Sequence, residues 1–504
     1  MIAIKARSLW SSLRPSPVMI AWPVIVFVFV ASRIWLHEIV TPALDQDSYK
    51  YLGGADALLN GGPLPPLFND LAVTGGGLHA VPGYAWFIEA VWRLVGRVAM
   101  SPILLSQSLV ALVGSLAACN LVHRAVGPWT AIVLFSALTI SPPIAWLEHM
   151  LMPDVFAPYL LFICVWLAVT GARGGKSGLV ASSFMGGTIA GAQILLRTAS
   201  QVYLPIPLIV AALSWKRAPA SIAWMIFYFS GIMLVVTPWI LNNHRRHGVY
   251  KVSHSMGRNL YFSALWTNTL DRREEAKRLG LSGPPTVTRS VLIADLEFRA
   301  ELASGKTIAQ ADDAMRDRAI EAYRRSPLTT LVVQRFKVVA ALFRPDPNMG
   351  NNLKPMRGNS AHHLNEYKWG IWLREWAEGR FGYRFSAALD EALENDVRHD
   401  PRALVFVRTW MDEFTLEGLP LLCTFLVATL VLMVLRSWLI LFAFAAPVAA
   451  FLSVFLIVGA PLWRYQAALH PFMLVVIVTA ISISLQTERN QIRLRRKLAD
   501  MSTR

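Results

Sequence analysis

Charged residues are scarce in this chain. Only 16% of its 504 residues are Asp, Glu, Lys or Arg, whereas soluble globular proteins carry about 25%. Apolar runs long enough to cross the roughly 30 Å hydrocarbon core of a bilayer recur from one end of the chain to the other. A soluble fold is therefore excluded, and the composition predicts an all-α polytopic membrane protein surrounded by membrane lipid.

Cysteines are also few. The three that are present, Cys119, Cys164 and Cys423, each lie inside an apolar run. Cysteines in such positions are typical of small core residues. Their placement favours neither a disulfide framework nor a cysteine-bound metal.

Acidic residues are outnumbered by basic ones, 32 against 48, which gives a formal net charge of +16. A charge of this sign can indicate nucleic-acid binding. Here much of the excess lies in short loops and tails that alternate with the apolar runs, as the positive-inside rule predicts. We therefore expect no nucleic-acid partner, and the basic linkers orient the chain in the membrane.

The amino-terminal segment resembles a signal peptide at first sight, because Lys5, Arg7 and Arg14 precede an apolar run over residues 18–36. The run is too long for a signal peptide, and residues 32–35 offer no cleavage site with small side chains. We predict an uncleaved first span whose amino terminus is cytoplasmic.

The apolar runs predict about ten membrane spans. The basic carboxy-terminal tail marks a second cytoplasmic end, so the number of crossings must be even. The short segment 328–343, which contains Gln334, Arg335 and Lys337, is therefore predicted to lie along the outer interface. The alternative is a true crossing, which would place residues 344–413 inside. The predicted spans are residues 18–36, 103–122, 129–146, 155–170, 179–196, 199–213, 222–241, 419–435, 438–458 and 465–485.

This topology divides the chain into three parts. Residues 1–241 form an amino-terminal transmembrane module with a first outer loop at 37–101. Residues 242–413 form an extracytoplasmic region that is partly helical, for example over 295–323. Residues 414–504 form the last transmembrane helices and the basic cytoplasmic tail.

The first outer loop carries two carboxylates, Asp45 and Asp47, directly before a predicted helix at 49–59. A carboxylate at a helix start on the membrane surface can act as a general base, or it can merely cap the helix. The Asp-x-Asp pair would also suit a divalent metal, but no second ligand cluster accompanies it. We therefore predict no cofactor and no metal site. Residues 81–98 are amphipathic and are expected to lie in the interface.

Two further patterns have structural explanations. His362 and His363 are adjacent, but no third ligand follows at a clear spacing, so a solvent-exposed pair is favoured over a metal site. Gly187 and Gly191 form a Gly-x-x-x-Gly pattern, which predicts close packing of two helices inside the bundle.

The residues around Asp47 resemble a known family. The stretch Asp47-Ser48-Tyr49-Lys50-Tyr51, followed by Ala55 and by Leu58-Leu59-Asn60-Gly61, resembles the first outer loop of the GT-C glycosyltransferases. These include the protein O-mannosyltransferases and the lipid A aminoarabinose transferases. In that family the Asp is the catalytic base that activates the acceptor. The resemblance implies this role for Asp47 rather than Asp45.

A second acidic residue is also implied by the resemblance. Residues 81–87 look like the segment that opens the family's second surface helix. Asp154 lies where many members have a second acidic residue at the start of the fourth span. Asp replaces Glu there and Pro153 precedes it, and these departures leave Glu148 as a rival.

The resemblance further implies a lipid-linked donor. Arg197, in Leu196-Arg197-Thr198, and Arg464, in Arg464-Tyr465, match basic motifs at the outer ends of spans. A polyprenyl-phosphate sugar presents its phosphate at this interface, where Arg gives bidentate contacts. Each Arg could instead only anchor a helix end. Further candidate substrate contacts, for which ordinary surface polarity is the alternative, are Asp45, Tyr51, Tyr84, His254, Arg258, Asn259 and Tyr465.

The function implied by the resemblance is that of an inverting glycosyltransferase in the cytoplasmic membrane, with its active site facing the periplasm or exterior. Its partners would be a polyprenyl-phosphate sugar donor and a glycan, lipid or protein acceptor. Neither the sugar nor the acceptor is identified by the sequence. Two alternatives are a transporter or flippase, which usually shows internal repeats that are absent here, and a polymerase or ligase of lipid-linked glycans.

Overall fold

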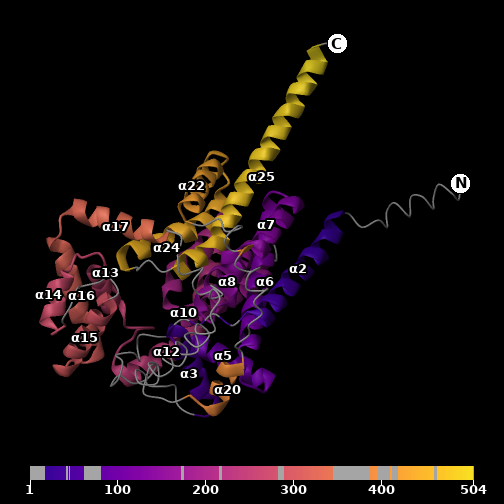
Figure 1. Cartoon of the computed structure of the whole chain (residues 1–504). Coiled ribbons are helices and arrows are strands. Elements are labelled where there is room, and N and C mark those ends of the chain that lie inside the picture. Colours follow the sequence, from indigo (N-terminus) through magenta and orange to yellow (C-terminus); the bar gives the residue numbers. More distant parts are fainter. Residues whose placement is uncertain are drawn as a thin grey trace.

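The structure is a computed structural model of the whole chain. It describes residues 17–40, 42, 44, 46–61, 81–171, 175–214, 218–281, 289–343, 385–395, 409–410, 418–458 and 463–502. The secondary-structure elements in these ranges are all helices (Figure 1). The predicted fold class, a helical membrane protein of many spans, is confirmed.

Six helices are long and apolar enough to cross a membrane. A seventh crossing is made if α7 (Pro128–Ile140) and α8 (Pro142–His149) count as one span, bent by 57°. The bend follows from Pro142 and Pro143, because proline cannot continue a preceding helix. The six helices are α2 (Pro17–Ile39), α6 (Ser101–Ala125), α9 (Phe156–Gly171), α10 (Gly175–Leu196), α12 (Ala218–His247) and α25 (Trp463–Ser502).

Three shorter apolar segments complete the bundle. One is formed by η2 (Thr198–Tyr203) and α11 (Pro205–Ser214), and a second is α22 (Gly418–Val434). The third runs through α23 (Trp438–Ile440), a π-helical turn η3 (Leu441–Ala445) and α24 (Ala446–Val458). Together with the long helices and the bent pair, these segments overlap every predicted span. Within the described residues, length and hydropathy identify six helices that could cross a membrane, or seven crossings if the bent pair is one span.

Helices α10 and α12 approach each other closely through glycine. A Cβ atom at Gly187 would lie 1.9 Å from the Tyr228 carbonyl oxygen, and one at Gly191 would lie 2.9 Å from the Val235 side chain. A Cβ on Gly231 of α12 would meet the Phe184 carbonyl oxygen at 2.4 Å. The close packing predicted from the Gly-x-x-x-Gly pattern is therefore present within the chain.

Two surface helices lie between α2 and α6 in the sequence. They are α3 (Gln46–Leu59) and α5 (Gly83–Val95), which pack on each other. One face of α5 is buried through Tyr84, Ile88 and Trp92, whereas Leu94 is 88% exposed. The amphipathic helix predicted from residues 81–98 is present, and Gly96 ends it in the left-handed conformation with a φ of 74°.

Ser386 is hydrogen-bonded to α3 and directly precedes α20 (Ala387–Asn395), a short helix late in the sequence. The carboxylate of Asp56 accepts hydrogen bonds from the Ser386 backbone N–H at 2.8 Å and from the Ser386 hydroxyl at 2.5 Å. Asp56 is only 3% exposed. The first outer loop and the region after residue 343 therefore meet on one side of the bundle.

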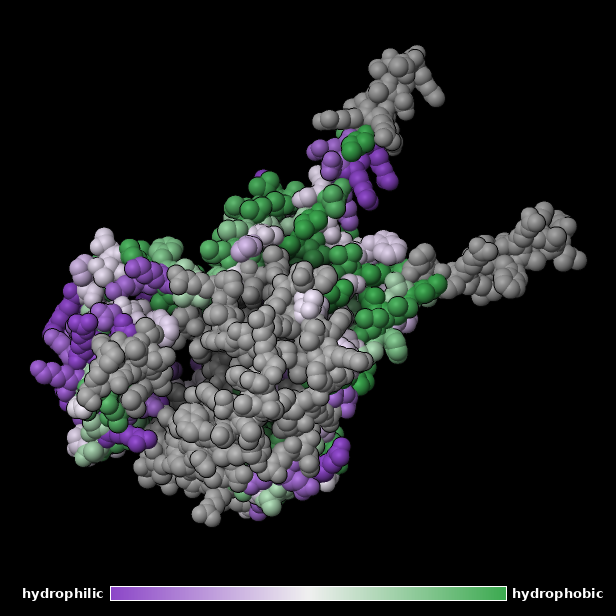
Figure 2. Space-filling view, viewed as in Figure 1, coloured by the Kyte–Doolittle hydropathy of each residue, from purple (hydrophilic) through white to green (hydrophobic). Residues whose placement is uncertain are grey.

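A small helical domain with its own core lies beside the bundle (Figure 1). It consists of α13 (Met256–Trp266), α14 (Arg272–Arg278), α15 (Arg289–Ala303) and α16 (Ile308–Arg325). Figure 2 shows that its visible face is largely hydrophilic, whereas apolar side chains gather around α2, α22 and α25. The domain therefore has the surface of a water-exposed body attached to a membrane bundle.

Residues 295–323, which the sequence predicts to be helical, lie in two helices, α15 and α16. Helix α15 ends at Ala303, and Gly305 adopts a φ of 86° that favours glycine. Helix α16 then begins at a capping box, in which Thr307 and Gln310 bond each other's backbone N–H at 3.3 and 2.9 Å.

Helix α17 (Leu328–Leu342) follows this domain and is not among the candidate spans. Its Leu328, Val332 and Phe336 side chains are 75%, 44% and 70% exposed. On another face, the Arg335 guanidinium donates to the Ser263 hydroxyl at 2.8 Å. This amphipathic arrangement supports an interfacial position for residues 328–343, which stays a prediction. The division of the chain into three parts also stays a prediction.

Candidate active site at one end of the bundle

Helix α3 brings the first candidate residues to the surface of α5. Asp47 occupies the first turn of α3, and Tyr51 follows one helical turn later. The Tyr51 ring packs edge-on against the Tyr84 ring, with centroids 5.0 Å apart. Tyr84 in turn lies 6.0 Å from the Phe156 ring at the start of α9. The aromatic contacts thus hold α3 and α5 against the start of α9.

The structure does not describe the side chains of several candidates. Asp45 lies outside the described residues, as do the side chains of Asp47, Arg464 and Tyr465. The backbone places Arg464 and Tyr465 in the first turn of α25, a helix that contacts the η1 turn (Pro153–Val155) carrying Asp154. The roles of these residues stay predictions.

Asp154 and Arg197 form a buried ion pair. The Arg197 Nη1 donates to the Asp154 Oδ1, and the two side chains are 14% and 3% exposed, in that order. Arg197 directly follows α10, and Asp154 precedes α9. A charged pair with so little exposure is retained only where each member compensates the other. The sequence predicted both residues without predicting that they meet.

Gly83 allows the start of α5 to lie against the end of α10, which Arg197 follows. A Cβ atom on Gly83 would lie 2.5 Å from the carbonyl carbon of Leu195, so only glycine allows the start of α5 to touch the last turn of α10. Tyr84 is consequently held next to the ion pair. Burial, together with the neighbouring Tyr51 and the carboxylate of Asp154, raises the pKa of Tyr84 well above its ordinary value. Tyr84 therefore remains a neutral hydrogen-bond donor.

Glu148, the rival acidic residue, has a different partner. It is fully buried, and the Arg33 Nε donates to its Oε2 at 2.8 Å. The Tyr159 hydroxyl donates to its Oε1 at 3.1 Å, and Arg33 also donates to the Thr139 carbonyl at 2.9 Å. With its oxygens engaged inside the bundle, Glu148 is less suited than Asp154 to face a substrate.

A buried polar network joins this second pair to Tyr84. The Tyr84 hydroxyl donates to the Gln107 Oε1 at 2.5 Å, and the Gln107 Nε2 donates to the Glu148 carbonyl at 3.1 Å. Nearby, the Nδ1 atoms of His37 and His149 lie 2.9 Å apart, so one of the two must carry a hydrogen. The sequence interpretation missed Arg33, His37 and Gln107, although polar residues within an apolar run were a usable signal.

The three candidates that follow the seventh predicted span lie elsewhere. His254, Arg258 and Asn259 belong to the helical domain, and their described contacts are within it. The Arg258 side chain pairs with Asp295 of α15, while Asn259 is exposed. The structure therefore brings Tyr51, Tyr84, Asp154 and Arg197 together and leaves these three outside that group.

A cavity of about 740 Å³ opens between α5, the start of α6 and α20. Charged side chains at its wall include Glu38, Arg93, Arg97 and Glu391. Among the described residues that line it, neither Asp154 nor Arg197 is present.

No protein-family model and no curated protein matches the chain. Among solved structures, ArnT from Cupriavidus metallidurans bound to undecaprenyl phosphate is 14% identical, with a TM-score of 0.36, over 92% of this chain and 78% of that one. The Archaeoglobus fulgidus oligosaccharyltransferase is 11% identical, with a TM-score of 0.47, over 97% of this chain and 52% of its own. The chain thus spans about half the length of the archaeal enzyme. In the course of its helices this chain is similar to these two GT-C fold glycosyltransferases, and at such identities the likeness concerns the fold alone.

Proposed function

We propose that the chain is an inverting glycosyltransferase that moves a sugar from a polyprenyl-phosphate donor to a glycan, lipid or protein acceptor. The reaction would take place at the outer face of the cytoplasmic membrane. The observation that carries the proposal is the buried Asp154–Arg197 pair, which lies beside Tyr84 and through it beside the helix that begins near Asp47. The proposal assigns the base to Asp47 on that helix and the cation to Arg197.

The chemistry assigned to Asp47 is that of a general base. Its carboxylate accepts the proton of an acceptor hydroxyl, and the oxygen attacks the anomeric carbon of the sugar. The bond between that carbon and the phosphate oxygen breaks, and polyprenyl phosphate leaves with the electron pair. Attack from the face opposite the phosphate inverts the configuration at the anomeric carbon.

Arg197 and Arg464 are assigned to the phosphate. Negative charge grows on the phosphate oxygens as the bond breaks, and a guanidinium that is already in position stabilises this charge without reorganising. Asp154 acts as a positioning residue, because its ion pair with Arg197 fixes the guanidinium at the end of α10. The polyprenyl tail would remain in the lipid around the bundle.

The test of Asp47 uses the full chain purified in detergent and a labelled polyprenyl-phosphate sugar with a membrane fraction as acceptor. Asp47→Asn keeps the size of the side chain and removes the base, so transfer is expected to fall at least about 100-fold. The matched control is Asp317→Asn, which makes the same substitution at a side chain that is 68% exposed on the helical domain.

Transfer by Asp47→Asn at the rate of the unsubstituted chain would overturn the mechanism. In reconstituted vesicles, movement of the labelled lipid without transfer would instead identify a transporter or flippase. Transfer from lipid-diphosphate glycans only would identify a polymerase or ligase.

A further inference from the structure

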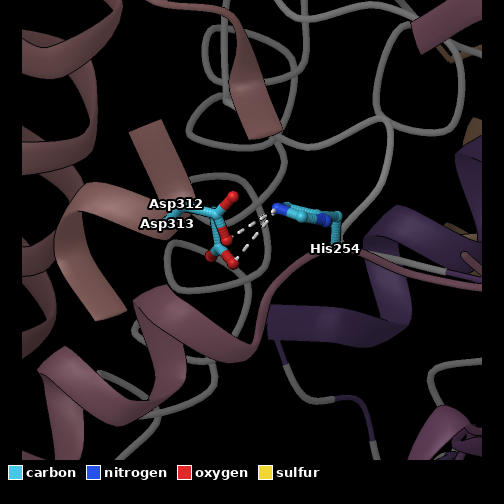
Figure 3. Close-up of side chains that lie close together, drawn as sticks. All are labelled: His254, Asp312 and Asp313. Carbon is cyan, nitrogen blue, oxygen red and sulfur yellow. Dashed lines mark ion pairs between the residues drawn. The ribbon is translucent and has the colours of Figure 1, made fainter. Parts of the chain in front are cut away.

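A histidine and two carboxylates converge in the helical domain, apart from the candidate active site (Figure 3). His254 lies in the segment between α12 and α13, and Asp312 and Asp313 lie in the second turn of α16. Their ligand atoms all lie within 4.8 Å of one another, which holds for no other group of three such residues in the described ranges.

The distances in this cluster are wider than hydrogen bonds. The His254 Nε2 lies 3.6 Å from the Asp312 Oδ2 and 3.8 Å from the Asp313 Oδ1. It lies 3.2 Å from the Ala309 carbonyl oxygen. A metal ion bound at about 2.1 Å holds neighbouring ligand atoms about 3.0–3.4 Å apart. Small rotations of the side chains would bring the three atoms to that spacing.

Asp312 is fixed in its orientation by the start of α13. Its two oxygens accept the backbone N–H groups of Gly257 at 2.9 Å and Arg258 at 2.8 Å. A Cβ atom on Gly257 would lie 1.8 Å from the Asp312 carbonyl oxygen, so glycine is required for this approach. Each carboxylate oxygen has a second lone pair, which leaves Asp312 able to bind an ion while these bonds remain.

His254 is a buried member of the cluster. The residue is 5% exposed, and its Nδ1 has no hydrogen-bond partner among the described residues. Its Nε2 is directed at Asp312 and Asp313 (Figure 3), with the Ala309 carbonyl on the same side. A single proton on Nε2 can serve only one of these acceptors. A cation of charge +2 on the unprotonated Nε2 would bind both carboxylates as well, and the imidazole proton would then lie on Nδ1.

We propose that His254, Asp312 and Asp313 bind a divalent metal ion of the first transition row, for which Zn²⁺ and Mn²⁺ are suitable probes. One imidazole nitrogen with carboxylate oxygens suits such ions. The Asp313 side chain is 41% exposed, so water would complete the coordination from that side. Arg316, which contacts Asp313 at 2.6 Å, also contacts Asp317 at 3.0 Å and can remain paired there. The ion would fasten the segment entering α13 to α16.

The experiment uses the full chain in detergent, stripped with a chelator and then titrated with Zn²⁺ and, separately, Mn²⁺. We expect one ion per chain, measured by elemental analysis after desalting, and a higher thermal unfolding temperature. Asp313→Asn is expected to lower the affinity at least tenfold. Glu321→Gln is the matched control, because it removes a carboxylate of the same helix that pairs with Arg325 at the surface.

Equal affinities in Asp313→Asn and Glu321→Gln would overturn the proposal, since general surface charge would then explain the binding. His254→Ala could weaken the fold by itself, so Asp313→Asn remains the deciding variant. A second comparison replaces both His362 and His363 by Ala. Loss of the ion in that double variant, with Asp313→Asn unaffected, would assign the metal to the other histidines. A failure of these tests leaves the proposed sugar transfer untouched.

Discussion

Two ion pairs of this protein illustrate how the exposure of a charged side chain decides how much its pair contributes to the free energy of unfolding. Arg33 and Glu148 are 2% and 0% exposed and compensate each other inside the bundle. Arg93 and Glu89 are one helical turn apart on α5, where Arg93 is 58% exposed. Water solvates Arg93 whether or not its pair forms, whereas Arg33 is the only cation that pairs with Glu148 among the described residues.

Arg33→Met is therefore expected to lower the free energy of unfolding by about 3–5 kcal/mol, because Glu148 is left buried without its cation. Adding Glu148→Gln should recover much of this loss, since the uncompensated charge is removed. Arg93→Met is the control and should cost less than about 1 kcal/mol. Unfolding in detergent, followed by circular dichroism, measures all three, and equal losses at Arg33 and Arg93 would contradict the expectation.

Among the elements, the four helices of the small domain are joined by a charged network. Glu275 of α14 accepts hydrogen bonds from Tyr261 of α13 at 2.8 Å and from Arg318 of α16 at 2.7 Å. Arg278 and Arg318 both pair with Glu297 of α15, whose side chain is 1% exposed. Side chains from α13, α14, α15 and α16 thus meet at one point beside the apolar core of the domain.

This network predicts an acid-sensitive domain. Burial acts to raise the pKa of Glu275, but the hydrogen bond from Tyr261 and the charges of Arg318 and Arg278 outweigh it, and the pKa is lowered. Because the folded state favours the ionised form, its contribution is complete above the ordinary pKa of 4.5 and is lost as the pH falls through the lowered value.

Glu275→Gln should therefore destabilise the domain at neutral pH and flatten the fall in stability at acid pH. Amide hydrogen exchange of α13–α16 between neutral pH and about pH 3 measures this directly. Glu321→Gln is the control, since Glu321 pairs with Arg325 at the surface, where it is 49% exposed. An unchanged acid limb in Glu275→Gln would show that other carboxylates control the transition.

For the molecule as a whole, the orientation of the chain is the main prediction. Figure 1 shows the end of α25 projecting from the bundle on the side away from α3, α5 and α20. The tail of α25 is basic, which predicts that this side is cytoplasmic. The contact of Ser386 with Asp56 supports a chain that returns to the outer side after α17 without crossing.

Single cysteines at Lys306, Glu391 and Arg493, all exposed positions, test this orientation. In a chain whose three own cysteines are replaced by Ser, a membrane-impermeant maleimide should label the first two in intact cells. The third should react only after permeabilisation. Labelling at Lys306 but not at Glu391 would mean that α17 crosses the membrane.

The spans and surface helices could be predicted from the sequence because they depend on local periodicity. The polar partners could not, because they come from distant positions: Arg33 and Glu148 are 115 residues apart. The same reason explains why the proposed metal site could not be predicted from the sequence. His254 and Asp312–Asp313 have no common motif, and only the packing of α16 on the start of α13 brings them together. Asp154 and Arg197 were identified by resemblance, and their pairing required the structure.

The contact between Asp56 and Ser386 also has a consequence for biosynthesis. The two residues are 330 positions apart, so α3 leaves the ribosome long before its partner is made. Until then the Asp56 carboxylate lacks the donors that Ser386 provides in the folded protein, and among the described residues of the loop Asn60 reaches it, at 3.1 Å. The outer surface is therefore completed late, when α20 docks on a loop that was synthesised among the first.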